Sequence, residues 1–222
     1  MSAKPSKIVI DYYSDVLCVW AWIAQARLDE LQKQWGDQVS LSHHFVEIFG
    51  NTHKKIPAQW GENDGYERFA AHVHQVAEPY PDAPINPDLW TTTRPSSSAQ
   101  AHLFLRAIEL VAGESMLSEM ALCLRHTFFV QGRDISDMTL LYSLAEDRAI
   151  DKTAVASCLN DGSAIAALSS DQKQATEMGV RGSPSWILNN GRQILYGNVG
   201  YRILNANIEE LLKHPAQEAS WC

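Results

Sequence analysis

The chain has 222 residues, of which 45% are hydrophobic and 20% are charged, and its formal net charge is −8. This length and composition predict one globular domain, or one domain with a large insertion. The acidic excess argues against nucleic acid as a partner, and no apolar segment is long enough to predict a membrane span. The opening residues, MSAKPSK, contain no apolar signal core, so we expect a cytoplasmic protein with reduced thiols.

The stretch from Ile8 to Trp35 predicts a strand, a short loop and a helix. β-Branched and aromatic residues between Ile8 and Tyr13 are typical of a strand. From Trp20 to Trp35, apolar residues recur every three or four positions, as on one face of a helix. Cys18 therefore lies where the strand is followed by the helix, and the free N–H groups and dipole of that helix end would favour the thiolate.

The sequence contains four cysteines, Cys18, Cys123, Cys158 and Cys222. Their spacing fits neither a disulfide framework nor a zinc site, and the histidine pairs of the chain lack further ligands, so we predict no metal. A free cysteine is most often a small buried apolar residue. Cys18 differs from the other three by its place at a strand-to-helix turn, which makes it the candidate nucleophile.

The segment Asp15-Val-Leu-Cys18-Val-Trp20-Ala21-Trp22 resembles the active-site turn of one thioredoxin-fold group. This group contains the DsbA-type disulfide oxidoreductases, the kappa-class glutathione transferases and the 2-hydroxychromene-2-carboxylate isomerases. The oxidoreductases carry Cys-x-x-Cys at this turn, whereas the transferases and isomerases carry serine at the first position. With Cys18 and Ala21, this chain departs from both patterns. A mixed disulfide at Cys18 would need a second molecule to resolve it, and glutathione is the obvious cytosolic thiol.

The remaining elements follow in chain order. A second strand is expected from Val39 to Phe49, and residues 50–94 are expected to form an ordered loop, a rim or lid, with one short helix from Tyr66 to Val76. A helical block is predicted between residues 96 and 175. Its helices are expected at Ser96–Gly113, Leu117–Phe128, Asp137–Arg148, Asp151–Leu159 and Ser163–Gly179.

The last part of the chain returns to strand and turn signals. A strand follows Gly179, the Asn189-Asn190-Gly191 turn predicts a hairpin with the strand Gln193–Tyr196, and a final helix is expected from Tyr201 to Leu212. This order matches the α/β thioredoxin-like fold with a large all-helical insertion that the resemblance implies. Residues 1–60 and 176–222 would form the thioredoxin-like domain, and residues 61–175 the inserted loop and helices.

The resemblance also implies binding residues. Ser183-Pro184 resembles the cis-proline of thioredoxin folds, where the backbone of the preceding residue pairs with substrate or glutathione, although a trans proline at a strand start is the alternative. Gly197-Asn198-Val199 resembles the segment that holds the γ-glutamyl end of glutathione in the transferases and isomerases, but Val199 replaces an acidic residue. Asn198 is then a glutathione ligand or an ordinary helix-entry residue.

Two further residues are candidates of the same kind. Trp20 flanks Cys18, so it lines an apolar substrate cleft or packs in the core. The resemblance implies that Lys54 or Lys55, just after the second strand, pairs with the glycine carboxylate of glutathione. A solvated loop lysine is the alternative for Lys54.

Three functions follow from these residues. The leading one is a cytoplasmic, glutathione-linked thiol oxidoreductase of monothiol type, acting on a thiol or disulfide in a peptide or small molecule. The second is a glutathione-dependent isomerase or transferase. The third is a non-catalytic binding or chaperone-like protein, whose sign would be Ala21 together with a buried, unreactive Cys18. A homodimer is implied by the relatives alone.

Overall fold

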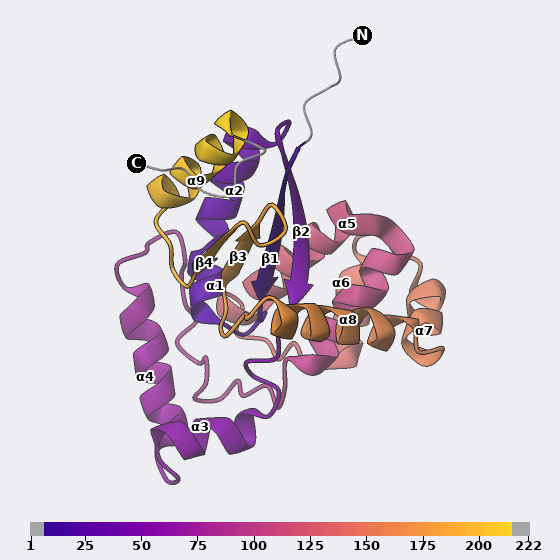
Figure 1. Ribbon diagram of the computed structural model, residues 1–222. Coiled ribbons are helices and arrows are strands. Elements are labelled where there is room, and N and C mark those ends of the chain that lie inside the picture. The colour runs from indigo at the N-terminus through magenta and orange to yellow at the C-terminus, as the bar shows by residue number, and fades with distance from the viewer. Residues whose placement is uncertain (1–6, 215–222) are drawn as a thin grey trace.

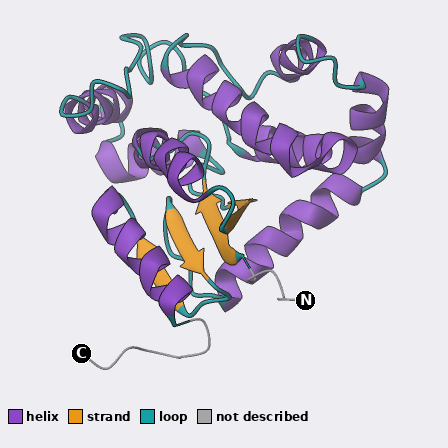
Figure 2. Cartoon of the chain, turned by 90° about the horizontal axis from the view of Figure 1, so that it is seen from above, coloured by secondary structure: helices purple, strands orange, loops and turns teal. Residues whose placement is uncertain are grey.

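The computed structural model describes residues 7–214 and is organised around a four-stranded sheet (Figures 1 and 2). The strands are β1 (Ile8–Ser14), β2 (Val39–Phe45), β3 (Ser185–Leu188) and β4 (Gln193–Tyr196). Their order is β2-β1-β3-β4, with β2 parallel to β1 and the other neighbours antiparallel. The thioredoxin-like arrangement predicted from the sequence is therefore present. The second strand is shorter than predicted and ends at Phe45.

Apolar helix faces cover one side of this sheet. The helices α2 (Gln25–Trp35) and α9 (Tyr201–Lys213) place Leu31 and Ile208 in one core cluster with Ile10 of β1. The helix predicted from Trp20 to Trp35 is divided at Ala24 into α1 (Val19–Ile23) and α2. The carbonyl of Ala24 accepts from the N–H groups of both Arg27 and Leu28, which begins a new helix at this point.

The segment predicted as a loop contains two helices. The helix α4 (Gly65–Ala77) includes the short predicted helix, but α3 (Thr52–Trp60) was not predicted. The presence of Pro57 argued against it, since proline removes one helical hydrogen bond. Asn51 compensates as the N-cap by accepting from the N–H of Lys54, and the buried side chain of Ile56 packs against the core.

The helical block follows the predicted order. Its members are α5 (Ala99–Phe129), α6 (Met138–Glu146), α7 (Lys152–Asn160) and α8 (Ser163–Glu177). Asp137 and Asp151 cap α6 and α7 as predicted. The predicted break at Gly113 is a kink inside α5, where φ is 84°, a value that favours glycine. One core cluster contains both Leu17 of the first turn and Phe104 of α5. The division of the chain into two domains at residues 60 and 176 stays a prediction.

None of the helices within residues 7–214 combines the length and apolar character that crossing a membrane requires.

The outer edge of β2 is bonded to side chains of the helical block. The N–H groups of His43 and Phe45 donate to carboxylates of Glu114 and Asp171, and Arg106 donates to the His43 carbonyl. An edge strand with free polar groups can pair with another chain. Here the groups of His43 and Phe45 are occupied, so the helical block anchors this end of β2.

Beside this edge, His44 bridges two carboxylates. Its Nδ1 lies 2.8 Å from Asp171 and its Nε2 lies 3.2 Å from Asp11. Burial lowers the pKa of His44, but the hydrogen bonds to Asp11 and Asp171 outweigh it and raise the pKa to about 9. The imidazolium form therefore links β1, β2 and α8 at neutral pH.

We expect His44 to contribute stability that depends on pH. Its folded pKa of about 9 exceeds the unfolded value of 6.5. The contribution is on the order of 2 kcal/mol after allowance for screening. It is full at pH values below the unfolded pKa and is lost as pH rises through the folded pKa. The free energy of unfolding in urea should decline over this pH range in the parent protein, and this decline should be absent in His44→Gln. The control His74→Gln should keep the decline, and identical slopes in all three proteins would contradict the prediction.

Candidate active site

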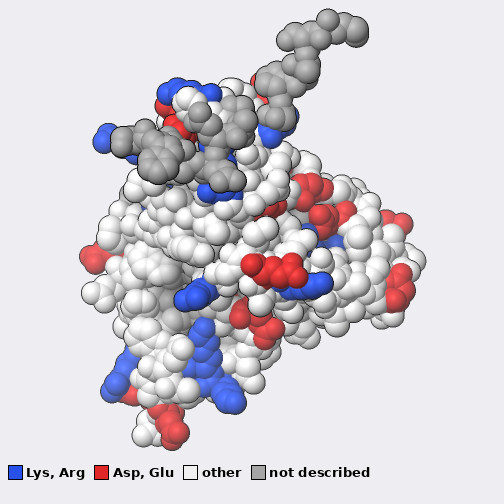
Figure 3. Space-filling view, viewed as in Figure 1, with Lys and Arg blue, Asp and Glu red and all other residues white. Residues whose placement is uncertain are grey.

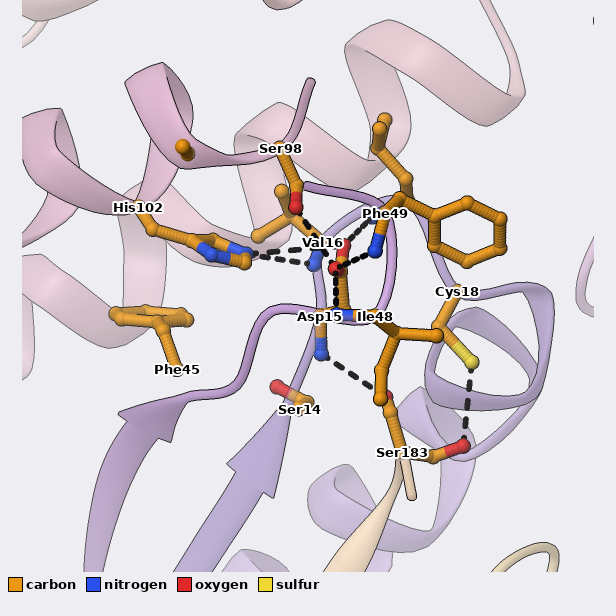
Figure 4. A network of polar contacts seen from close by, with 12 residues as sticks. Ser14, Asp15, Val16, Cys18, Phe45, Ile48, Phe49, Ser98, His102 and Ser183 are labelled. Atoms are coloured by element: carbon orange, nitrogen blue, oxygen red, sulfur yellow. Dashed lines mark hydrogen bonds and ion pairs between the residues drawn. The ribbon is translucent and has the colours of Figure 1, made fainter. Parts of the chain in front are cut away.

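Cys18 is the N-cap residue of α1, at the point predicted from the sequence. Its side chain is 6% exposed, and Sγ donates a hydrogen bond of 3.2 Å to the carbonyl of Ser183. The Ser183-Pro184 bond is cis, as predicted. The structure thus brings together three of the predicted site residues, from opposite ends of the chain (Figure 4).

A second contact fixes the same two segments. The N–H of Asp15 donates to Oγ of Ser183 over 2.9 Å. The turn that carries Cys18 is therefore bonded to the side chain of Ser183 at its start and to the carbonyl of Ser183 at the sulfur. Two bonds to one residue fix both the position and the orientation of the thiol relative to the cis-proline.

The carboxylate of Asp15 is fully buried and accepts four hydrogen bonds (Figure 4). One oxygen accepts from the N–H of Leu17, and the other accepts from the N–H groups of Ile48 and Phe49 and from the hydroxyl of Ser98, all between 2.8 and 2.9 Å. Donors on every side satisfy the oxygen atoms of a carboxylate that is shielded from water. Asp15 thereby joins the Cys18 turn, the segment after β2 and the start of α5.

His102 completes the support of the turn as a neutral ring. Its Nε2 accepts from the N–H of Val16 over 3.2 Å, so that nitrogen carries no proton. Burial lowers the pKa of His102, with the charge of Asp15 acting in the opposite direction. The separation of 3.7 Å between this nitrogen and Asp15 Oδ1 is therefore not an ion pair. The ring of Phe45 stacks on that of His102 at 5.0 Å and holds its orientation.

The prediction that the helix end favours the Cys18 thiolate is wrong for this arrangement. Burial raises the pKa of the thiol, and the charge of Asp15 adds to the effect. The Ser183 side chain and the N–H groups of Ala21 and Trp20 lower the pKa, but by less. α1 has only five residues and no side-chain cap bond, so its end offers little compensation. The structure therefore holds Cys18 as a neutral thiol.

Asn198 is linked to the cis-proline loop through the residue before it. Asn198 follows Gly197, whose N–H donates to the Pro184 carbonyl over 2.8 Å, and Nδ2 of Asn198 donates to the hydroxyl of Tyr80 over 2.7 Å. The Oδ1 atom of Asn198 is buried and has no partner within residues 7–214. Val199 packs against the core cluster under α9 rather than presenting a polar group.

Two predicted binding residues, Trp20 and Lys54, have surroundings that differ from those of Trp22 and Lys55. Trp20 packs against the core, whereas Trp22 lines a cleft of about 550 Å³ with Ile23, Arg27, Tyr80 and Tyr201. Trp22, not Trp20, is thus the tryptophan that borders this cavity. Lys54 is exposed on α3, over which basic side chains gather in Figure 3. The side chain of its neighbour Lys55 is bonded within the protein, because Nζ donates to the Ile48 carbonyl.

Sequence reasoning missed Asp15, Ser98 and His102 as parts of the site. Asp15 had appeared only as a turn residue. Ser98, which donates to its carboxylate, and His102, which accepts from the N–H of Val16, are more than 80 positions away from the turn along the chain. Only the Asp15-to-Cys18 spacing within the turn motif gave a local signal. No group of three His, Cys, Asp or Glu side chains suited to a metal ion occurs among the residues that the structure describes.

We expect Asp15→Asn to destabilise the protein by about 2–4 kcal/mol, because an amide nitrogen would face N–H donors in a buried site. The free energy of unfolding from urea titration measures the loss. Asp151→Asn is the matched control, since Asp151 is an exposed N-cap whose replacement by asparagine should cost less than about 0.5 kcal/mol. Equal stability of Asp15→Asn and the parent would show that the buried carboxylate does not hold the turn.

Comparison with known proteins agrees with this geometry. The family model described as the DSBA-like thioredoxin domain matches residues 9–209, whereas the sequence matches no curated protein. The fold is similar to that of a Nitrosomonas europaea protein provisionally assigned as a protein disulfide isomerase, at 14% identity and TM-score 0.77, covering 94% of this chain and 99% of that one. The fold is also similar to that of the cytosolic disulfide reductase DsbM of Pseudomonas aeruginosa, at 18% identity and TM-score 0.70, covering 92% of this chain and 98% of that one. A 2-hydroxychromene-2-carboxylate isomerase is similar at 15% identity and TM-score 0.67, covering 96% of this chain and 100% of that one. The chain belongs to the DSBA-like thioredoxin domain family.

Proposed function

We propose that this protein is a cytoplasmic thiol-disulfide oxidoreductase of monothiol type that uses glutathione as its second thiol. The observation that carries the proposal is the contact of Cys18 Sγ with the Ser183 carbonyl beside the cis-proline. Ala21 stands where a second cysteine would be, and it is fully buried. One thiol at a peptide-binding edge supports disulfide exchange through a mixed disulfide, without an internal disulfide as the oxidised state.

The reaction has two exchange steps. In the first, the Cys18 thiolate attacks one sulfur of a substrate disulfide, the substrate S–S bond breaks, and one substrate sulfur leaves as a thiolate. In the second, a glutathione thiolate attacks the substrate sulfur of the mixed disulfide. This releases Cys18 as a thiolate and the substrate as a mixed disulfide with glutathione. The enzyme is unchanged, and one substrate thiol has been exchanged for glutathione.

Substrate binding would prepare the thiol for the first step. In the structure the Ser183 carbonyl accepts the Cys18 proton, which stabilises the thiol form. A substrate backbone added as a strand against Ser183 would donate an N–H to the same carbonyl. Cys18 would then lose its acceptor, and the N–H groups of Trp20 and Ala21 would remain near the sulfur to favour the thiolate.

Three residues would hold glutathione in the proposed complex. The Oδ1 atom of Asn198, which is buried and has no hydrogen-bond partner within residues 7–214, would accept from the γ-glutamyl ammonium group. The backbone of Ser183 can pair with the central peptide, and the exposed ammonium of Lys54 can pair with the glycine carboxylate. A structure of DsbM from Pseudomonas aeruginosa with GSH shows that a protein of this fold holds the tripeptide.

The first test uses oxidised glutathione. We expect Cys18 to form a mixed disulfide that accumulates, detected by mass spectrometry, because no second thiol lies at position 21. Ala21→Cys should release glutathione and form an internal disulfide instead. Cys123→Ser is the control and should react like the parent. The proposal fails if the parent forms no adduct, or if an adduct is retained in Cys18→Ser.

The second test addresses glutathione recognition. Millimolar reduced glutathione should raise the thermal unfolding temperature of the parent. Asn198→Ala should abolish most of the rise, and Val199→Asp should increase it by adding a carboxylate for the ammonium group. Asn207→Ala, on the far turns of α9, should respond like the parent. An equal shift in the parent and Asn198→Ala would remove Asn198 from the binding site.

A binding protein without catalysis is the second candidate, favoured by the burial of Cys18 and the raised pKa of its thiol. This function would need the Ser183 edge but not the sulfur. Peptide binding that persists in Cys18→Ala, with no thiol reaction of the parent toward oxidised glutathione or iodoacetamide, would select it over the oxidoreductase.

A further inference from the structure

A cleft with aromatic walls borders the site. This cleft of about 550 Å³ is lined by the buried side chains of Trp22 and Ile23 and by the partly exposed rings of Tyr80 and Tyr201. Its volume is within the range of cavities that hold ligands. The proposed exchange at Cys18 uses none of these four side chains, so its two steps do not explain the cleft.

The polar atom of each aromatic side chain is bonded to a residue outside the cleft. Nε1 of Trp22 donates to the Pro84 carbonyl over 3.2 Å, the hydroxyl of Tyr80 accepts from Nδ2 of Asn198 over 2.7 Å, and the hydroxyl of Tyr201 donates to Oε1 of Gln34 over 2.7 Å. The ring of Trp22 is also stacked on that of Phe129 at 5.7 Å. These rings are therefore fixed, and they offer a ligand apolar surface rather than donors or acceptors.

The charged side chains of the cleft do not favour a charged ligand. The guanidinium of Arg27 lies over the ring of Tyr80, 5.9 Å from its centroid. The carboxylate of Glu30 lies 3.8 Å from the ammonium of Lys33, and Asp82 is exposed. Both signs of charge thus occur among the lining residues. An apolar centre with a polar rim is the usual anatomy of a protein interface, so the cleft suits an uncharged aromatic group.

Hydrogen bonds connect the cleft with both halves of the site. Trp22 lies one helical turn after Cys18 in α1, and its N–H donates to the Cys18 carbonyl over 3.1 Å. Asn198, which donates to Tyr80, directly follows the residue whose N–H bonds to the Pro184 carbonyl. The thiol and the cis-proline are therefore each linked to one wall of the cleft.

The spacing of Cys18 and Trp22 indicates which part of a substrate would reach the cleft. Four residues of helix advance by about 6 Å. In an extended peptide, side chains two positions apart point to the same side and are separated by about 7 Å along the chain. A peptide whose cysteine meets Cys18 would direct the side chain two positions away toward the cleft, whereas the side chain next to the cysteine would point away from it.

We propose that this cleft is a specificity pocket for an aromatic side chain two positions from the reacting cysteine of a peptide substrate. Glutathione, the second thiol of the proposed reaction, has no ring, so the cleft would distinguish the substrate from the resolving thiol. The inference rests on the proposed disulfide exchange at Cys18 and names the substrate class for it. Trp22, Tyr80 and Tyr201 bind the substrate in this scheme and take no part in the chemistry.

The experiment compares four peptides with acetyl and amide ends, in which the cysteine carries a methyl disulfide. The reference is Gly-Gly-Cys-Gly-Gly. In the others, phenylalanine stands two positions before, two positions after or directly before the cysteine. Cys18 attacks the peptide sulfur, the S–S bond to the methylthio group breaks, methanethiolate leaves, and mass spectrometry follows the Cys18–peptide adduct. The full chain carries Cys123→Ala, Cys158→Ala and Cys222→Ala, so that Cys18 is the reporting thiol.

Phenylalanine two positions from the cysteine, on one side of it, should raise the rate of adduct formation about tenfold over the reference peptide. Phenylalanine next to the cysteine should change the rate by less than about twofold. Ala26→Trp, at an exposed residue that lines the cleft, should fill the cleft and remove most of the gain. Ala166→Trp, at an exposed alanine of α8, is the matched control and should keep it.

The inference is overturned if no peptide gains, if the gain belongs to the adjacent position, or if Ala26→Trp keeps the gain. Binding is also measured apart from exchange, with serine in place of the peptide cysteine. The indole N–H resonance of Trp22, assigned by its loss in Trp22→Phe, should shift with the phenylalanine peptide that gains in rate and not with the reference.

The two measurements separate the inference from the proposed function. A shifted Trp22 resonance in a protein that forms no adduct with oxidised glutathione would overturn the exchange reaction and retain the cleft as a binding site for an aromatic side chain. An adduct with oxidised glutathione, together with neither a rate gain nor a shifted resonance, would retain the exchange reaction and overturn the specificity pocket.

Discussion

The buried carboxylate of Asp15 is the interaction on which the rest of the site depends. Its four donors come from the Cys18 turn, the segment after β2 and the start of α5. A single charge, shielded from water, thus fixes three parts of the chain that meet at one end of the sheet. The N–H of the same residue donates to Ser183, so the cis-proline loop is placed relative to this centre as well. The alignment of Cys18 with the Ser183 carbonyl follows from that network.

The same network fixes the position of the Cys18 sulfur but lowers its reactivity. Packing Cys18 against Ser183 defines where the sulfur lies, but the burial that achieves this raises the pKa of the thiol. The negative charge of Asp15, which the turn requires, raises it further. A reactive sulfur in this place therefore needs two things. One is a substrate backbone that takes over the Ser183 carbonyl, and the other is a positive charge that does not occupy the substrate edge.

Local signals in the sequence predicted most of the fold. The strand β1, the Asn189-Asn190-Gly191 hairpin and the aspartate caps of α6 and α7 depend on neighbouring residues, and the structure contains them as predicted. The cis bond before Pro184 followed from resemblance. What failed depends on tertiary contacts: α3 forms despite Pro57 because it is capped and packed, and the Cys18 pKa is set by burial. Arg125 and Ser14 are 111 positions apart, and periodicity on α5 could not distinguish a buried arginine from a surface one.

Ala21 makes the surroundings of Cys18 more important than they would be in a dithiol protein. A second thiol at position 21 would resolve a mixed disulfide inside the chain, whatever the substrate. The buried methyl group found there cannot do so. In the proposed reaction the resolving thiol is that of glutathione, and residues that surround the sulfur would select it. Ser183 directly precedes Pro184, and Asn198 follows Gly197, whose N–H donates to the proline carbonyl. The Oδ1 atom of Asn198 has no hydrogen-bond partner among the described residues. With alanine at position 21, the proposed reaction would therefore be controlled by the cis-proline loop and not by a second thiol in the turn.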